Sequence, residues 1–100
     1  MIEILLGLKV DDADGYAQYR AEMTPLLALH GGSFPFDAEV AQVLRPEEGA
    51  DLNRVFCMRF PSEEQMTAFF EHPEYLEIRQ RLFSPSVSRV HRFGKYSVLG

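Results

Sequence analysis

The sequence predicts an α+β fold whose elements follow the order β, α, β, β, α, β. Residues 2–10 alternate apolar side chains with others, which is the period of a strand, and residues 16–30 repeat apolar side chains at helical spacing. Residues 54–60 are rich in β-favouring side chains and run into Pro61, which lacks an N–H for the strand ladder. Ser62 then offers a helix cap, so a strand feeds a helix directly.

Length, composition and charge limit the possible classes of protein. The chain has 100 residues, the commonest size for a single domain, and we expect one domain over residues 1–100. Hydrophobic residues make up 46% and charged residues 25%, which is typical of a globular rather than a disordered chain. The formal net charge is −5 and no run of Lys or Arg occurs, so nucleic acid is not an expected partner.

No segment is expected to target the chain to a membrane or to cross one. Residues 1–8 are apolar but short, lack a basic start and contain Glu3, which favours a first strand over a signal peptide. No other run approaches membrane-spanning length. The single cysteine, Cys57, cannot form an internal disulfide, so we expect a cytoplasmic location. Cys57 lies in a strand among apolar neighbours and is expected to be a buried, unreactive thiol.

The first strand and first helix are the clearest elements. The even residues of strand 2–10 form its core face, while the odd face carries Leu5 and Gly7. Acidic residues at 11, 12 and 14 cap the following helix, and Gly31 and Gly32 end it. Pro25 is expected to distort this helix without stopping it, because the stripe facing the sheet keeps its phase. That stripe comprises Tyr16, Tyr19, Arg20, Met23, Leu26, Leu27 and His30.

A second strand is expected from residue 33 to residue 45, starting at a sheet edge or bulge because it contains Pro35. Residues 46–50 form a polar turn, and the strand at residues 54–60 follows. One face of the second strand is predicted to carry Phe34, Phe36, Ala38, Val40, Gln42 and Leu44.

The second half repeats the pattern. A helix capped by Ser62 runs to His72, Pro73 interrupts it, and a second short helix extends to Phe83. Residues 84–86 are predicted to break this helix, and residues 87–99 form the last strand, with a bulge at Gly94.

The order βαββαβ is the ferredoxin-like plan, with a four-stranded antiparallel sheet and both helices on one face. The other face of such a sheet is uncovered, and here it is predicted to be too apolar to remain in water. A second subunit is the simplest cover, so we expect a homodimer. The residues predicted on this face are Leu5, Val43, Val55, Cys57, Val87 and Phe93.

Several motifs resemble the family known as domain of unknown function 1330, within the dimeric α/β-barrel superfamily. They are Tyr16-x-x-Tyr19-Arg20, Pro25, Gly31-Gly32, Phe60-Pro61-Ser62 and Pro73-Glu74-Tyr75. The resemblance spans residues 1 to about 90. It implies a ferredoxin-like subunit and a face-to-face dimer whose two sheets form a dimeric α/β barrel. It implies no particular reaction, since relatives in the superfamily include cofactor-free monooxygenases, lactone isomerases and haem enzymes.

His30 is the candidate catalytic residue, because it ends the sheet-facing stripe beside two glycines that permit close approach. It could act as a general base or anchor a ligand. The alternative is a histidine favoured by the helix C-terminus and bonded to a backbone carbonyl.

Five tyrosine and arginine residues are candidate ligand-binding groups. On the first helix they share one stripe, and on the second helix two of them are spaced i, i+4, so both sets could face one cleft between sheet and helices. The alternative is that these side chains only cover the rim of the core. The residues are Tyr16, Tyr19, Arg20, Tyr75 and Arg79.

Neither a metal site nor a cofactor is predicted. His72 and His91 lack metal-ligand spacing with His30, and no phosphate-binding loop or nucleophile motif occurs. Two functions remain open. One is a cofactor-independent enzyme, of monooxygenase or isomerase type, acting on a small carboxylated or enolisable molecule. The other is a non-catalytic module that binds a metabolite or only dimerises.

Overall fold

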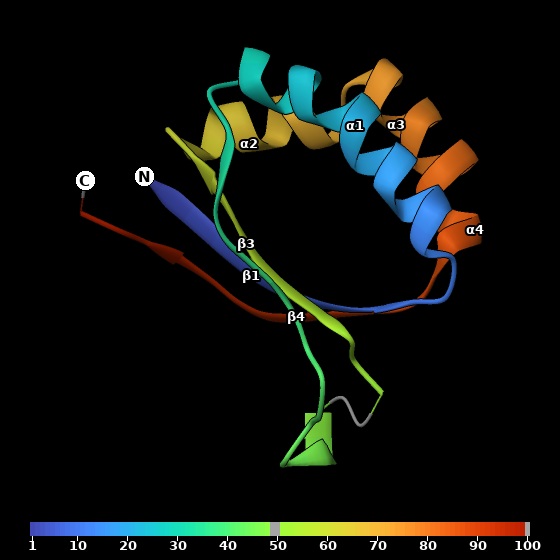
Figure 1. Ribbon diagram of the computed structural model, residues 1–100. Helices are drawn as coiled ribbons and strands as arrows, with labels where there is room; N and C mark the ends of the chain where they lie inside the picture. Colours follow the sequence, from blue (N-terminus) through green and yellow to red (C-terminus); the bar gives the residue numbers. More distant parts are fainter. Residues whose placement is uncertain (49–50, 100) are drawn as a thin grey trace.

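Four strands form one antiparallel sheet in the order β2-β3-β1-β4, and the main helices lie together on one face of it (Figure 1). The computed structural model describes residues 1–48 and 51–99. The elements in chain order are β1 (Ile2–Val10), α1 (Ala13–Leu29), β2 (Ser33–Glu39), η1 (Pro46–Glu48), β3 (Arg54–Phe60), α2 (Glu63–Phe70), α3 (Pro73–Ile78), the π-helical turn η2 (Arg79–Phe83), α4 (Ser84–Ser86) and β4 (Val87–Ser97). The predicted ferredoxin-like α+β architecture is confirmed.

The predicted helix caps are present. Asp12 accepts a hydrogen bond from the N–H of Gly15, and Ser62 accepts one from the N–H of Gln65. Helix α1 continues through Pro25, as the unbroken stripe predicted, and ends at Leu29. Gly31 follows the C-cap, with a φ of 71° that belongs to the left-handed region. One cap was not foreseen: Nδ1 of His72 accepts from the N–H of Glu74 and starts α3.

The prediction for the second strand is wrong in two respects. β2 ends at Glu39, so Val43 lies outside the sheet. The pairing of β2 with β3 shifts between Ser33 and Phe36, across Pro35, which has no N–H to donate. Phe34 therefore packs on Phe56 beneath the helices, while Phe36 lies opposite Cys57 on the other face and is 54% exposed.

The predicted break at residues 84–86 is also wrong, because the chain stays helical through η2 and α4. Pro85 stands near the start of α4, where a proline is tolerated, and the hydroxyl of Ser86 donates to the carbonyl of Leu82. The predicted bulge in β4 is confirmed: the pairing with β1 jumps from Gly94 to Arg92. Beyond this bulge Tyr96 joins the face of Cys57, not the face of Val90.

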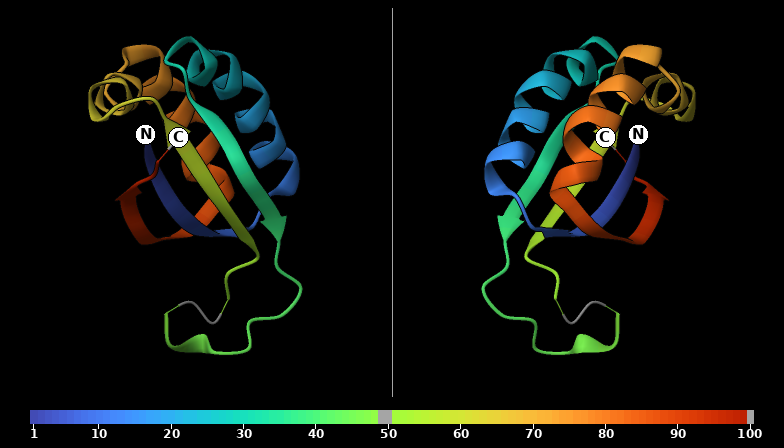
Figure 2. Two further views of the ribbon diagram at one scale, coloured as in Figure 1. Left: turned by 90° about the vertical axis from the view of Figure 1, so that its left-hand side faces the viewer. Right: turned by 90° about the vertical axis from the view of Figure 1, so that its right-hand side faces the viewer.

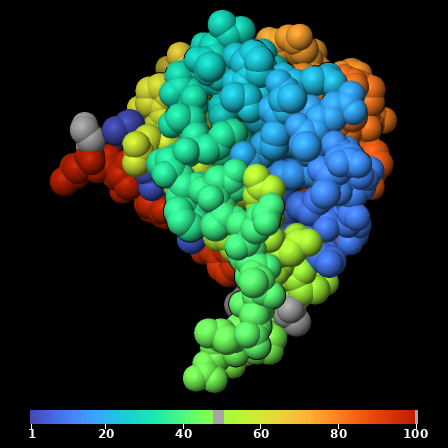
Figure 3. Space-filling model, viewed as in Figure 1, coloured from blue at the N-terminus to red at the C-terminus, as the bar shows by residue number. Residues whose placement is uncertain are grey.

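The chain that follows β2, including η1, projects away from the sheet and the helices (Figures 2 and 3). Asn53 ties the base of this projection to the end of β1, with its side-chain amide donating to the carbonyl of Val10 at 2.9 Å. Its amide oxygen accepts from the N–H of Val10 at 2.8 Å. Of the predicted turn at residues 46–50, residues 46–48 form η1, and residues 49–50 lie outside the described part of the chain.

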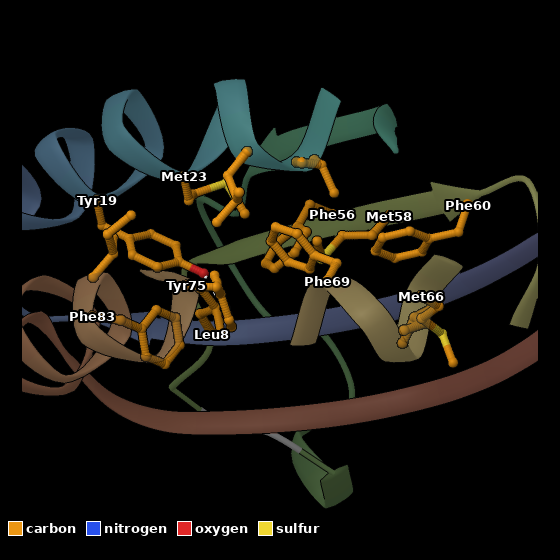
Figure 4. Packing of buried hydrophobic residues seen from close by; sticks show 14 of the residues in the cluster. Leu8, Tyr19, Met23, Phe56, Met58, Phe60, Met66, Phe69, Tyr75 and Phe83 are labelled. Carbon is orange, nitrogen blue, oxygen red and sulfur yellow. Dashed lines mark hydrogen bonds between the residues drawn. The ribbon is translucent and has the colours of Figure 1, made fainter. Parts of the chain in front are cut away.

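The inner face of the sheet, which the helices cover, carries the core (Figure 4). Phe60 and Phe69 are completely buried, and Leu8 and Met23 are only 1% exposed. Aromatic rings dominate this core: Phe69 packs against Phe60 and Tyr75, with centroid distances of 5.8 and 4.4 Å.

Within the described part of the single chain, no helix covers the outer face (Figure 1). Leu52 reaches back over Gly7, where a side chain would collide with Leu52 and Phe93 at 2.7 and 2.8 Å. Phe93 is nonetheless 46% exposed. Val87, predicted on this face, instead packs against the core. A polar group also occupies the outer face, since Arg59 forms an ion pair with Glu3 at 2.6 Å.

No helix within residues 1–48 and 51–99 has the length and apolar character needed to cross a membrane.

Candidate functional site

A cavity of about 400 Å³ lies between the inner face of the sheet and the helices. We call it the inner cavity. Most of its walls are aliphatic, aromatic or methionine side chains from β1, β3, α1 and α2, such as Leu6, Phe56 and Met23. Its size and apolar walls, with a few polar groups, are those of a small-molecule site. The polar lining groups are Tyr19, Arg20, Tyr75, Arg79 and Arg92.

The rim of the inner cavity is formed by β4 on one side and by α3 and η2 on the other. Leu76 and Val90, both lining residues, are each 49% exposed. Arg79 and Arg92 line the cavity and are exposed as well. Within the described residues neither arginine forms a salt bridge, so two guanidinium groups stand at the rim without a protein carboxylate.

Two tyrosine hydroxyls form the buried polar end of the inner cavity. The oxygens of Tyr19 and Tyr75 lie 2.9 Å apart, and these residues are 5% and 4% exposed. Burial raises the pKa of Tyr19 far above its ordinary value, and it also raises the pKa of Tyr75, although Tyr19 and Arg79 oppose that shift. Both hydroxyls therefore stay protonated in neutral solution and act as hydrogen-bond donors rather than bases.

The rings of this pair are held by aromatic packing. Tyr19 packs against Phe83 of η2 with ring centroids 5.0 Å apart, and against Tyr75 at 6.4 Å. The wider π-helical turn thus contributes both Arg79 and Phe83 to one cavity. Such turns are frequent at functional sites.

Arg20 is held at the opposite wall by its own partners. Its guanidinium lies 3.9 Å from the centre of the Phe34 ring and donates to Asp37 at 3.2 Å. Its Nε also donates to the hydroxyl of Tyr16 at 2.7 Å. Arg54 donates twice to the same carboxylate, both times at 2.8 Å, and this pair holds the pKa of Asp37 below its usual range.

Tyr16 belongs to a different hollow from Tyr19. It lines a second cavity of about 520 Å³ on the far side of Arg20, together with Glu39, Asn53 and Arg54. Burial raises the pKa of Tyr16 as well. The predicted cleft containing Tyr16 with Tyr75 and Arg79 is thus wrong for Tyr16, while the structure does bring Tyr19, Arg20, Tyr75 and Arg79 together.

His30 does not line either cavity. Its Nδ1 lies 2.9 Å from the carbonyl oxygen of Leu26, and its ring packs against Phe69 and His72 with centroids 5.8 and 5.7 Å apart. Although His30 belongs to the same stripe of α1 as Tyr19 and Arg20, it lies outside the cleft, because the stripe continues past the end of the cavity. A catalytic part for His30 stays an untested prediction that this position does not support.

Arg92 is the functional candidate that the sequence reasoning missed. It shares a face of β4 with Val90, two residues away, and lies opposite Leu6 of the cavity wall. A charged residue among the inward-facing positions of an edge strand was the available signal.

The lining of the inner cavity contains no imidazole, thiol or carboxylate among the described residues. A bound molecule therefore meets hydrogen-bond donors and positive charge but no general base of ordinary strength. Within the same part of the chain, no three His, Cys, Asp or Glu side chains are grouped as they would be to hold a metal ion.

Solved structures with the same fold cover nearly the whole chain. A protein of unknown function from Rhodopseudomonas palustris, RPA0582, has a TM-score of 0.83 at 17% identity, over 99% of this chain and 82% of that one. A DABB family protein with a ferredoxin-like fold from Mesorhizobium loti has a TM-score of 0.68 at 17% identity, over 99% and 97%. SnoaB, a cofactor-independent oxygenase from Streptomyces nogalater, has a TM-score of 0.63 at 12% identity, over 99% and 93%.

At these identities the solved structures establish the fold alone. Comparison with curated protein sequences found no match. A sequence-family profile does match, over residues 4–90. The chain belongs to the family described as Domain of unknown function (DUF1330).

Proposed function

We propose that this protein binds a small, largely apolar organic anion in the inner cavity. The observation that carries the proposal is the pair of guanidinium groups, Arg79 and Arg92, that line an otherwise apolar cavity without a carboxylate partner among the described residues. A carboxylate or enolate suits these groups, because a planar guanidinium donates two parallel hydrogen bonds to such an oxygen pair.

The apolar walls of the inner cavity limit the chemical character of the rest of the ligand. Leu6, Met23 and Phe56 offer no hydrogen bonds, so a polar body would lose its hydration without replacement. A planar or branched hydrocarbon frame gains from the same surface, at roughly 25 cal/mol per Å² of apolar area buried. An aromatic or short aliphatic acid is the class that fits both the rim and the walls.

Catalysis is the second candidate function. The neighbour SnoaB is a cofactor-independent oxygenase, so the fold supports this chemistry in at least one protein. In the present chain the lining supplies donors that could stabilise an enolate, but no base to create one. Oxygenase or isomerase activity of this chain would therefore need a substrate acidic enough to ionise in solution. Binding without catalysis is the function that the geometry supports better.

The binding proposal is tested with a matched pair of probes, 4-isopropylbenzoate and the uncharged 4-isopropylbenzamide. Isothermal titration and thermal unfolding should show that the carboxylate binds and raises Tm, while the amide binds at least tenfold more weakly. Salt should weaken only the carboxylate, because its contribution is electrostatic.

Arginine variants test which guanidinium groups bind the carboxylate. Arg92→Gln and Arg79→Gln should each weaken the carboxylate severalfold and leave the amide unchanged. Arg89→Gln, on the same strand but outside the cavity and paired with Asp51, is the control and should leave both probes unchanged. Equal binding of acid and amide, or equal losses in Arg89→Gln and Arg92→Gln, would overturn the proposal.

We also propose a homodimer formed through the outer face of the sheet, as in the dimeric α/β barrel that the family resemblance implies. Phe36 and Phe93 are 54% and 46% exposed there, beside Val55 and Leu5. A second copy offers the same apolar face, and a two-fold axis would pair the two sheets.

A cytoplasmic location is proposed on the state of the single cysteine, Cys57, which is a buried free thiol. Fractionation of the cells that make the protein tests this location.

A further inference from the structure

The buried tyrosine pair of the inner cavity has two hydroxyl protons, and only one of them has an acceptor within the described residues. Tyr19 and Tyr75 have one O–H each, and the hydrogen bond between their oxygens consumes one of the two protons. No other acceptor within the described residues bonds to either hydroxyl. Arg79, which interacts with Tyr75, only donates. One proton of the pair is therefore available to a bound molecule.

A spare donor in this position favours a ligand with a matching acceptor. Tyr19 and Tyr75 are only 5% and 4% exposed, and a buried donor left without an acceptor weakens binding. Both tyrosines line the inner cavity, so an atom of the ligand can reach them. The apolar residues packed around the pair, Phe83 and Leu8, offer nothing to accept this proton (Figure 4).

The acceptor should be uncharged. The loss of water that raises the pKa of both tyrosines acts against any anionic oxygen at the same place. The charge of Arg79 reduces this effect at Tyr75 without cancelling it. A ketone, aldehyde or amide carbonyl avoids the penalty, whereas a carboxylate is better placed at the exposed rim, beside Arg92.

We propose that the ligand is an oxo acid: its carboxylate lies at the rim beside Arg79 and Arg92, and its uncharged carbonyl oxygen accepts the spare proton of the Tyr19–Tyr75 pair. This inference rests on the proposed binding function and narrows the ligand from an organic anion to one with a second, neutral acceptor. The two recognition points lie on one cavity wall and its rim, which fixes the orientation of the ligand as well as its class.

The test compares 4-acetylbenzoate with 4-isopropylbenzoate, which has nearly the same shape and charge but lacks the carbonyl oxygen. The wild-type protein should bind the acetyl compound about five- to tenfold more tightly, because the isopropyl group leaves the buried donor unpaired. In the double variant Tyr19→Phe/Tyr75→Phe this preference should disappear, because no buried donor is left to be unpaired, and 4-isopropylbenzoate should bind at least as tightly as it binds the wild-type protein.

The double variant is preferable to either single variant. Removing both hydroxyls leaves no unpaired group in the core, and such paired replacements are close to neutral for stability. A single Tyr→Phe change leaves one hydroxyl that can still donate to the ligand. Tyr96→Phe, on the outer face, is the control and should keep the full preference.

Infrared spectroscopy gives a readout that does not depend on affinity. The ketone stretch of bound 4-acetylbenzoate should move to lower wavenumber in the wild-type protein and in Tyr96→Phe, but not in the double variant. Equal affinity for the two acids in the wild-type protein, or a preference that survives in the double variant, would overturn the oxo-acid inference. In either case the binding of 4-isopropylbenzoate itself would still support the proposed function. If the proposed function were wrong, neither acid would bind.

Discussion

The inner and outer faces of the sheet both combine apolar side chains with a few charged groups. They differ in the exposure of the apolar residues and in the pairing of the charges. On the inner face Phe60 and Phe69 are completely buried, whereas Phe36 and Phe93 on the outer face are about half exposed. The charged groups differ too: Glu3 and Arg59 neutralise each other on the outer face, while Arg79 and Arg92 at the inner cavity have no carboxylate among the described residues.

The contrast indicates what each face is suited to contact. A largely apolar surface can meet a copy of itself, and the ion pair between Glu3 and Arg59 leaves these two charges matched within each chain. A cavity with two cations and a buried donor is suited to a small anion.

The largest effect is expected in the inner core. Phe69→Ala removes a completely buried ring that packs against Phe60, Phe70 and Tyr75, and it should cost roughly 3–5 kcal/mol of unfolding free energy. Denaturant titration measures this loss, which should not depend on protein concentration. Phe36→Ala is the matched outer-face variant, and its effect should appear mainly at low concentration, where the proposed dimer would dissociate. A loss of less than 1 kcal/mol in Phe69→Ala would show that the inner face is not the core.

Val55→Asp should weaken the dimer by roughly 3 kcal/mol, because it places an unpaired charge in the centre of the outer face. Val55 lies opposite Gly7 and Ala38 in the sheet, so the charge would stand between two subunits. Sedimentation velocity at micromolar concentration should give a dimer for the wild-type chain and an 11.4 kDa species for the variant. Ala28→Asp, on the exposed side of α1, is the control. A wild-type chain that sediments as a monomer would show that the outer face does not form the proposed dimer.

His30→Ala should cost about 1 kcal/mol, through the lost hydrogen bond to Leu26 and the contact with Phe69. Titration with 4-isopropylbenzoate should give unchanged affinity, because His30 does not line the inner cavity. Loss of binding with unchanged stability would restore His30 as a site residue.

The ion pair between Asp37 and Arg54 should contribute a smaller, pH-dependent stabilisation of about 0.5–1 kcal/mol to the unfolding free energy, because it is partly exposed to solvent. Arg54 and Arg20 lower the pKa of the Asp37 carboxyl in the folded state, below the ordinary 3.8. The stabilisation is therefore present above the unfolded pKa and is lost as pH falls through the folded one. Asp37→Asn should destabilise the protein at pH 7, and this difference should shrink as pH falls through the folded pKa of Asp37, as urea titrations at a series of acidic pH values would show. Glu71→Gln, an exposed change of the same kind, is the control.

Chemical labelling of Cys57 tests whether this position on the outer face is buried, and it needs no substitution that would alter stability. Burial raises the pKa of its thiol, and Glu3, 3.5 Å from the sulfur, acts in the same direction. A thiol reagent at pH 8 should label the native protein at least about a hundredfold more slowly than the protein in denaturant. Equal rates in the two states would place Cys57 in solvent and contradict the pairing of β3 with β1.

The local elements of this protein were predictable because their causes lie within a few residues of one another. Ser62 caps α2 through a bond to Gln65, three residues away, and Gly31 ends α1 because it adopts a left-handed φ. The period of residues 2–10 likewise places Leu8 in the core.

The composition of the candidate site was decided by the tertiary structure. The bulges at Pro35 and beside Gly94 exchange the faces of the residues that follow, and a bulge depends on the pairing with another strand. The length of the inner cavity is set by where α3 and η2 cross α1, so it includes Tyr19 and excludes His30, although both belong to one helical stripe. Residues 90 and 92 join the site only because β4 pairs with β1 at the open edge of the sheet. That arrangement depends on contacts between residues more than 80 positions apart, which no local pattern in the sequence encodes.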